Sequence, residues 1–204
     1  MLTVGADEAE VERLLAGGGL ECPWCGGVLA RWGHARPRVL RGGQELVRLR
    51  PRRARCRGCG ATHVLLPAFA LLRRADLAEV IGAALAAKAA GKGVRPIAAA
   101  AGRAAGTVRG WLRRFGSRAE AVRAFFTGLL VEVGVDPVPP AQGPSPFADA
   151  VAAVAGAAVA AGVRGQRRPA AVAGLAPVAV QHELPLTAGV LVLGAFAGSY
   201  FGDL

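Results

Sequence analysis

Acidic residues, lysine and aromatic side chains are scarce in this sequence. Of its 204 residues only 14 are Asp or Glu, against 25 Lys or Arg, and aromatic residues make up 5%. After residue 135 the acidic side chains are few and widely scattered: Asp136, Asp149, Glu183 and Asp203. A metal-dependent nuclease needs several carboxylates converging on its ions. We therefore expect no nuclease domain there and, more generally, no enzyme.

Several familiar motifs are also missing. The sequence has no G-x-S-x-G, no P-loop and no G-x-G-x-x-G. Its start lacks the basic and apolar regions of a secretory signal. The longest apolar stretches, 147–163 and 184–201, are rich in Ala and contain Asp149 and Pro185, whereas a membrane span needs about 20 strongly apolar residues. We expect a cytoplasmic protein with no membrane segment.

Positive charge is concentrated in the first 118 residues. Residues 31–57 contain ten Arg and one Glu, and residues 73–118 contain ten basic and two acidic side chains. Residues 119–204 are close to neutral. A basic region joined to a neutral one is typical of a protein that binds a polyanion with one part of its chain.

All four cysteines lie in two C-x-x-C-G motifs, and these predict a metal site. Thirty residues separate the pairs, a spacing typical of four thiolates around one tetrahedral ion; the ligands are Cys22, Cys25, Cys56 and Cys59. Strand-like segments at Val28–Trp32, Glu45–Arg50 and Thr62–Leu66 complete a zinc ribbon over residues 20–67. We expect one structural Zn²⁺ per chain, with no open coordination position for catalysis.

Other interpretations of the cysteines are two disulfides, a redox dithiol or a rubredoxin-like iron site. Disulfides are rare in cytoplasmic proteins, and a redox dithiol needs only one pair. Iron accepts the same ligands as zinc, but an electron carrier has no evident use for the surrounding arginines. His34 and His63 are further candidate ligands, although an ordinary strand or loop position is the simpler interpretation of each.

Two groups of basic residues are candidate DNA contacts. The first follows a strand into the second cysteine motif and consists of Arg50, Arg52, Arg53 and Arg55. Like charges this close together repel, so they favour either solvent exposure or an anionic partner. The second group, on and beside a predicted helix, consists of Arg103, Thr107, Arg109, Arg113 and Arg114. We expect both groups to contact double-stranded DNA.

Residues 70–116 have the pattern of a helix-turn-helix. Such a motif needs a small residue where two helices cross, a glycine in the turn and apolar anchors on the second helix. Ala98, Gly102, Val108 and Trp111 supply these at the right spacing. Burial of Val108 and Trp111 would turn Arg109 and Arg113 toward a major groove. The alternative is a three-helix core that binds no nucleic acid.

Together these motifs resemble an uncharacterised bacterial family, catalogued as a domain of unknown function. The resemblance rests on CPWCGG, RRARCRGCGATHVLLPAF and GVRPIAAAAGRAAGTVRGWLRRF, and spans residues 20 to about 116. More distantly, the same segments resemble the N-terminal DNA-binding region of insertion-sequence transposases and their accessory proteins. This resemblance implies DNA binding linked to mobile elements, and a transposase or integrase encoded nearby as a possible partner.

The remaining segments complete a predicted fold that is mostly α with a small N-terminal β ribbon. We expect an acidic helix in 1–19, a packing helix in 117–135 that begins with a Ser117–Glu120 capping box, and a Pro-rich linker in 136–146. Ala-rich helices are expected at 147–163, 168–180 and 186–200, within the region 147–204, and their apolar surface is expected either to complete the core or to form a homodimer. The predicted function is that of a zinc-stabilised helix-turn-helix DNA-binding protein, either a mobile-element accessory factor or a transcriptional regulator. The alternative is a protein-interaction module that does not bind DNA.

Overall fold

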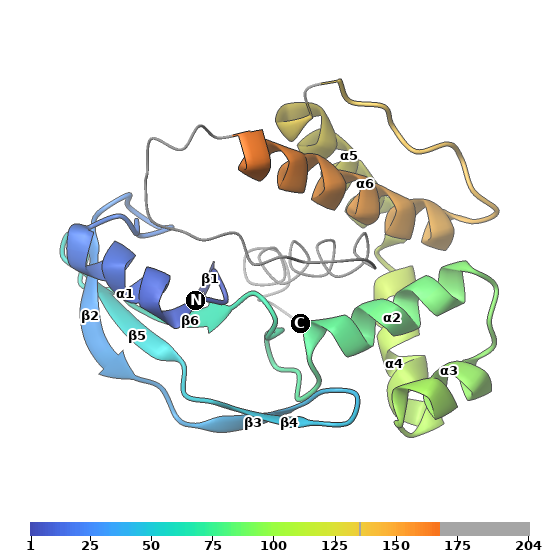
Figure 1. Cartoon of the computed structure of the whole chain (residues 1–204), viewed down its shortest axis with the longest axis horizontal. Coiled ribbons are helices and arrows are strands. Elements are labelled where there is room, and N and C mark those ends of the chain that lie inside the picture. The colour runs from blue at the N-terminus through green and yellow to red at the C-terminus, as the bar shows by residue number, and fades with distance from the viewer. Residues whose placement is uncertain (135, 168–204) are drawn as a thin grey trace. The chain divides into compact units, whose positions relative to one another are not determined.

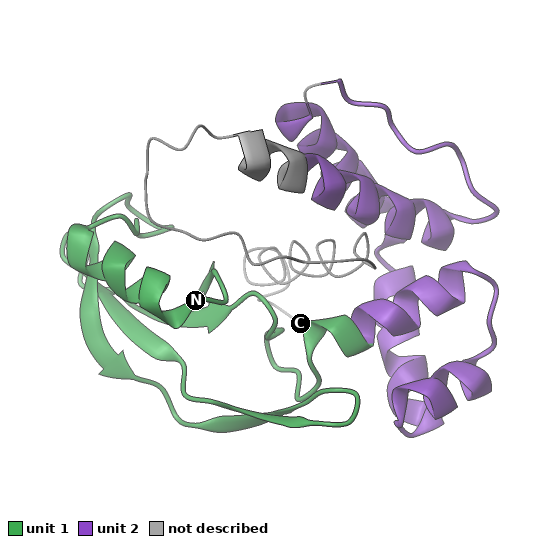
Figure 2. Cartoon of the chain, in the orientation of Figure 1, with its two compact units in different colours: residues 1–80, 191–204 green, residues 81–190 purple. Residues whose placement is uncertain are grey.

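The computed structural model describes residues 1–134 and 136–167. These form two compact units, the first ending at Val80 and the second beginning at Ile81 (Figure 2). We call them the N-terminal unit and the helical unit, and describe each by itself.

The N-terminal unit is built on a four-stranded mixed sheet with the strand order β1-β6-β5-β2 (Figure 1). Strands β2, β5 and β6 are antiparallel neighbours, whereas β1 pairs with β6 in parallel. Two further strands, β3 and β4, form a separate two-stranded sheet. The bounds are β1 Leu2–Val4, β2 Leu29–His34, β3 Arg38–Arg41, β4 Leu46–Leu49, β5 Arg52–Cys56 and β6 Thr62–Pro67.

The β3–β4 hairpin continues the β2–β5 pair beyond a break. The Ala35 N–H donates to the Pro51 carbonyl across this break, and Pro51 cannot donate to a ladder itself, which favours an interruption there. The hairpin is fastened to the residues before α2 (Ala78–Ala89) by an ion pair of 2.9 Å between Arg41 and buried Asp76. Residues 38–77 are thus tied into the N-terminal unit.

Helix α1 (Glu8–Gly17) supplies the apolar cover for one face of the sheet. It begins where the Asp7 carboxylate accepts N–H groups of the first turn and ends at Gly18, which has a φ of 72°. Its buried face inserts Val11 and Leu15 into a core with residues from three strands: Leu29, Ala54 and Leu65. Burying such side chains is the main favourable contribution to folding, at about 25 cal/mol per Å² of apolar surface.

The helical unit contains most of α2 and four further helices: α3 Val94–Ala101, α4 Ala105–Gly116, α5 Ala119–Val133 and α6 Pro146–Arg167. Helices α5 and α6 lie side by side (Figure 1). Small residues allow close packing, since Ala150, Ala153 and Ala157 of α6 are fully buried. The rings of Phe115 and Phe147 are 4.8 Å apart and join α4 to α6.

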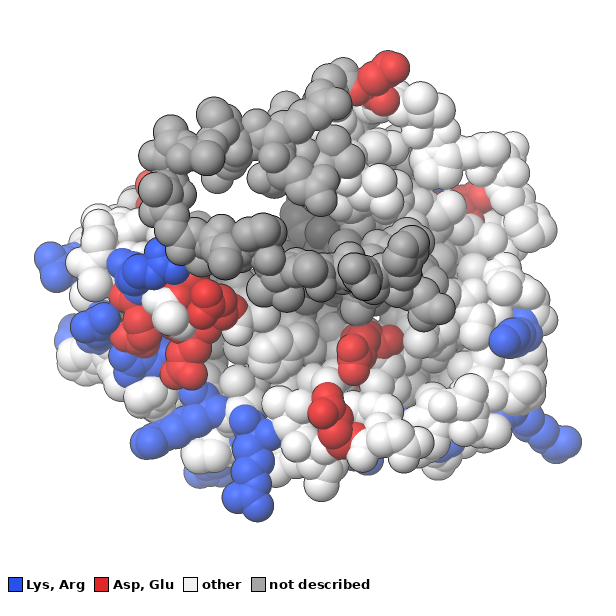
Figure 3. Space-filling view, in the orientation of Figure 1, with Lys and Arg blue, Asp and Glu red and all other residues white. Residues whose placement is uncertain are grey.

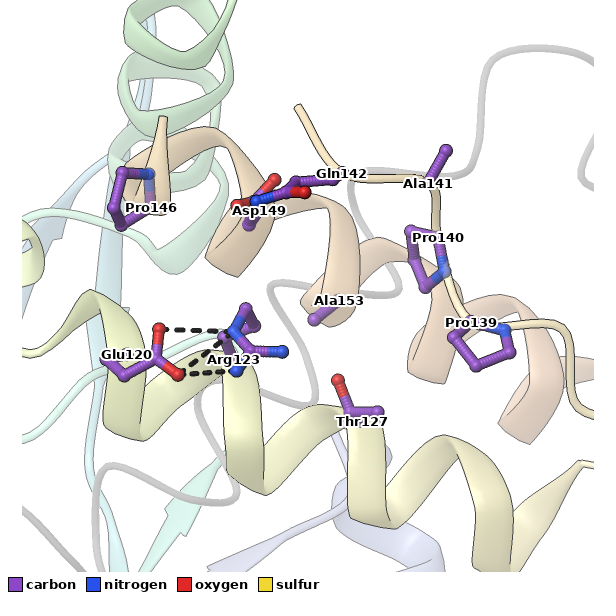
Figure 4. A pocket seen from close by; sticks show the side chains of 10 residues that line it. All are labelled: Glu120, Arg123, Thr127, Pro139, Pro140, Ala141, Gln142, Pro146, Asp149 and Ala153. Atoms are coloured by element: carbon purple, nitrogen blue, oxygen red, sulfur yellow. Dashed lines mark hydrogen bonds and ion pairs between the residues drawn. The ribbon is translucent and has the colours of Figure 1, made fainter. Parts of the chain in front are cut away.

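The Pro-rich segment before α6 is held against the α5–α6 pair. Together they enclose a cleft of about 430 Å³ (Figure 4). Its charged side chains already have partners, because Arg123 binds Glu120 and Asp149 accepts the Gly143 N–H. The Asp149 contact therefore holds the Pro-rich loop to α6, and the Glu120–Arg123 pair lies on the surface of α5.

The predicted fold class is wrong. The described residues contain six strands as well as six helices, so the chain is not mostly α with a small ribbon. Strands β2, β5 and β6 belong to a four-stranded mixed sheet, because the three-residue β1 adds to β6 in parallel, and the segment expected as a ribbon strand at Glu45–Arg50 instead forms β4 of a separate hairpin with β3.

Two other expectations concern the second half of the chain. The Ser117 hydroxyl donates backward to the Arg114 carbonyl and α5 begins after Arg118 without a side-chain cap, so the predicted capping box does not form. The helix expected at 147–163 is present as α6, and those expected at 168–180 and 186–200 lie outside the described residues. Over the described ranges, no helix is both long enough and apolar enough to cross a membrane.

Candidate metal centre and basic surfaces

The two C-x-x-C-G segments fold as near copies of each other. In the first, the Gly26 N–H donates to Cys22 and the Cys22 N–H donates to Gly27, at 2.9 and 2.8 Å. In the second, Gly60 donates to Cys56 and Cys56 to Ala61, at 3.1 and 2.8 Å. Each turn needs a left-handed residue after its second cysteine, and glycine supplies it with φ of 69° at Gly26 and 74° at Gly60. We call these turns knuckle 1 (residues 22–27) and knuckle 2 (residues 56–61).

The knuckles bring all four predicted ligands together. One sulfur from each of Cys22, Cys25, Cys56 and Cys59 lies within 4.8 Å of the others. Two of the pairs span the knuckles, at 3.5 Å for Cys25–Cys56 and 3.8 Å for Cys22–Cys59. A tetrahedral ion with metal–sulfur bonds of about 2.3 Å separates its ligands by about 3.8 Å. The cluster can therefore hold a metal ion, as the sequence predicts.

The same distances argue against disulfides. A disulfide needs sulfurs about 2.05 Å apart, and all four cysteines are free. A glycine keeps the gap between the knuckles open, because a β-carbon on Gly27 would lie 3.0 Å from the Cys56 sulfur and 3.3 Å from the Cys25 sulfur. The close approach of the two turns depends on this missing side chain.

Hydrogen bonds differentiate the thiols of knuckle 2. The N–H groups of Cys59 and Gly58 point at the Cys56 sulfur, at 3.4 and 3.3 Å, and help lower the pKa of Cys56 to about 6. The Ala61 N–H acts to lower the pKa of Cys59, but the neighbouring thiols and burial outweigh it and raise that pKa to about 11. Four sulfurs this close cannot all be ionised without a cation to balance them, which is the chemistry of a thiolate metal site.

His63 of β6 lies directly behind the cluster. Its ring is 1% exposed, and Nε2 lies 3.4 Å from the Cys22 sulfur. Burial, and then the positively charged N-terminus, lower the pKa of His63. A neutral ring with its proton on Nε2 donates that proton to the sulfur. His63 thus supports a ligand from outside the coordination shell, whereas His34 lies 3.2 Å from an Arg52 nitrogen.

The first group of predicted DNA contacts is divided between two faces of the sheet. Arg52 lies on the α1 face, where both its Nε and Nη2 donate to the Glu12 carboxylate. Arg53 and Arg55 lie on the opposite face, because they pair with Val64 and Thr62 while Ala54 between them pairs with buried His63. We call that side the outer face. Arg50 lines a cleft of about 390 Å³ with Pro51 and Phe69.

The second group lies on and beside α4. Helix α3 ends at Gly102 with a φ of 63°, and the Arg103 N–H returns to the Ala98 carbonyl at 3.0 Å. Ala98, Val108 and Trp111 are buried as predicted. Their burial leaves Arg109, Arg113 and Arg114 exposed along α4, with Thr107 half-buried. Arg103, also half-buried, donates to the Ala101 and Gly102 carbonyls.

Basic side chains gather over both units (Figure 3). On the N-terminal unit the basic side chains adjoin a patch of acidic ones (Figure 3). Among the ion pairs of this unit, Glu12 binds both Arg31 and Arg52. Sequence reasoning did not single out Trp32 of β2, which is half exposed and lies 4.8 Å from the Arg55 guanidinium carbon. The signal that could have identified Trp32 was its place at the end of the predicted strand Val28–Trp32, an aromatic residue beside Arg31.

Fold and site thus define a cysteine-centred α+β unit followed by a helical unit with a basic helix. Residues 22–111 match a family model described as a domain of unknown function (DUF6431). That interval begins at the first cysteine and ends at Trp111, so it contains all four cysteines and the α3–α4 turn. The predicted resemblance to an uncharacterised domain is confirmed to that extent. No curated protein and no solved structure matches the chain.

Proposed function

We propose that this chain is a DNA-binding protein in which α3 and α4 act as a helix-turn-helix and the cysteine cluster holds a structural Zn²⁺. The observation that carries the proposal is that a tight, glycine-capped turn precedes a helix, α4, whose exposed side carries arginines. Arg109 lies next to buried Val108 and one turn before Arg113, so both guanidinium groups leave the same side of the helix. That arrangement suits a helix in a major groove.

Zinc is the metal we assign to the cluster. It favours tetrahedral thiolate sites, and structural zinc supplies much of the folding free energy of small domains. The ion would leave a net charge of about −2 on four thiolates, which the His63 N–H and the Cys59 and Gly58 amides partly offset. We propose no catalytic role for it, because four cysteines fill a tetrahedral shell.

In this proposal the protein works in the cytoplasm, where thiols stay reduced, as a regulator or as an accessory factor of a mobile element. A transposase or integrase encoded nearby and a second copy of the chain are its candidate partners. An exposed apolar pair on the β3–β4 hairpin favours the alternative, a protein-interaction module: Leu46 and Val39 are 70% and 49% exposed.

The test is duplex binding by the full-length, zinc-loaded protein. Footprinting across the native locus would first locate a site. Because the salt dependence of affinity reports the number of phosphates neutralised, contacts from the arginines on α4 should give a log–log slope of about −3. Arg109→Ala should cost about 1 to 3 kcal/mol on the preferred site and much less on random duplex.

Arg13→Ala is the matched control. Arg13 is an exposed residue of α1 beside Glu10, so its substitution removes the same charge from a different, acidic part of the surface. It should leave affinity and slope unchanged. Absence of salt-dependent binding to any duplex at about 50 mM salt would reject the proposal and favour the interaction module.

A further inference from the structure

The outer face of the N-terminal sheet presents an exposed tryptophan among arginines. Strand pairing places Arg53 opposite Val64, and Arg55 opposite Ala30 and Thr62. Residues directly opposite each other share one face of a sheet. Trp32 belongs to the same face, because its ring lies under the Arg55 guanidinium, 4.8 Å from ring centre to carbon.

This pair is held in place by the metal centre. The Nε of Arg55 donates to the Gly60 carbonyl of knuckle 2 at 3.2 Å. On the neighbouring strand, β2 begins where knuckle 1 ends, with Leu29 opposite Cys56. Arg55 is thus held by knuckle 2, and Trp32 lies on the strand that begins after knuckle 1.

Among the described residues, the arginines of this face have no acidic partner. Over the described residues neither Arg53 nor Arg57 takes part in an ion pair, and Arg55 binds only a carbonyl and the Trp32 ring. By contrast, Arg31 and Arg52 on the opposite face both bind Glu12. The outer face therefore combines unneutralised positive charge with an aromatic ring that is half exposed.

We infer that the outer face is a binding platform for single-stranded nucleic acid. An unpaired base offers an open π face to Trp32 or to the guanidinium plane of Arg55, and the adjoining arginines contact the phosphates on either side. In a duplex the bases already stack on one another, so no base face is free to stack on the Trp32 ring. The inference rests on the proposed function for its class of ligand and adds a second site, distinct from α4.

The experiment uses the full-length, zinc-loaded chain and fluorescence anisotropy of labelled oligo(dT), oligo(U) and duplex DNA of about 15 nucleotides. Trp32→Ala should weaken binding to the single strands by about 5- to 100-fold, with little change for duplex. Trp32→Phe should retain most of the affinity, because a phenyl ring still stacks. Zinc content measured for each variant shows that the ribbon remains folded.

Trp24→Ala is the matched control. Trp24 is even more exposed, at 73%, but it lies on knuckle 1 against His63, away from Arg55. Its loss should leave single-strand affinity unchanged. Trp32-dependent binding of oligo(dT), oligo(U) or both supports the platform, and the ratio between them tells which strand is preferred.

Single-strand affinity that is absent, that does not change in Trp32→Ala, or that falls equally in Trp24→Ala overturns the inference. Arg109→Ala separates this result from the proposed function. If duplex binding depends on Arg109 while single-strand binding is absent, the helix-turn-helix proposal stands and the platform fails. If single-strand binding depends on Trp32 while duplex binding is absent, the platform stands and the helix-turn-helix proposal fails.

Discussion

At the scale of single residues, Glu12 determines which arginines of the sheet are neutralised by an ion pair. Its carboxylate lies between Arg31 and Arg52 and holds them against α1. The sequence shows a dense run of arginines, but the side on which each one lies depends on strand register, which the structure shows through pairs such as Ala54 with His63. The cysteine ligands needed no such information, because their spacing alone carries the signal.

Glu12→Gln should destabilise the N-terminal unit by about 1 kcal/mol at pH 7, the value for a partly buried ion pair. The Arg52 hydrogen bond lowers the pKa of Glu12 from its usual 4.5, so the stabilisation is complete above pH 4.5 and is lost as the pH falls through the lower, folded pKa. Urea unfolding at several pH values checks this.

The difference between wild type and Glu12→Gln should therefore shrink in acid. Glu45→Gln, an exposed change in the β3–β4 turn, should alter the free energy of unfolding by less than about 0.5 kcal/mol at any pH. A constant difference down to low pH would contradict the ion-pair explanation.

At the scale of elements, helices of the second unit could be predicted more fully than strands of the first. The α3–α4 turn follows from local signals, since Gly102 alone supplies the left-handed cap. Strand β1 has only three residues, and Leu2 pairs with Leu65, which is distant in sequence. No local sequence pattern therefore predicts this strand. Half of the β3–β4 hairpin was predicted, because the segment Glu45–Arg50 contains β4, whereas β3 lies among arginines and a proline that give no clear strand pattern.

Helix α4 begins without a side-chain cap, which gives a prediction. Ala104 has extended backbone, with φ −58° and ψ 138°, and is exposed, so a serine there can accept an N–H of the first turn. Ala104→Ser should raise the free energy of unfolding of the helical unit by about 1 kcal/mol. Thermal unfolding followed by circular dichroism measures it.

Ala100→Ser provides the comparison for this variant. Position 100 is exposed inside α3, where serine caps nothing and has a lower helix propensity than alanine by about 0.5 kcal/mol. It should therefore destabilise slightly. Equal effects of the two serines, in sign and size, would show that capping is not the cause.

At the scale of the whole molecule, the two compact units should respond separately to loss of the metal. The described part of the helical unit contributes no cysteine to the cluster. Chelation, or Cys59→Ser, should release one zinc per chain and remove hydrogen-exchange protection from β5 and β6, because so small a ribbon lacks a sufficient core without its ion. Helices α3 to α6 should keep their protection.

Thr62→Ser is a control for this variant, since it changes an exposed outer-face residue near knuckle 2 without touching a sulfur. It should retain the metal and the exchange pattern. A sheet that remains fully protected after exhaustive chelation would show that the cluster is not needed for folding, and loss of protection in both units would show that they unfold as one.

The parallel pairing of β1 with β6 determines the order in which the sheet can be assembled during synthesis. The β2–β5 pair and each knuckle join segments that are closer in sequence, whereas Leu2 must wait for Leu65 to leave the ribosome. Closing the longest loop costs the most chain entropy and slows the step that requires it. Strand β1 is thus translated before its partner but docks after it, and until then the edge of β6 is open to pairing with other chains.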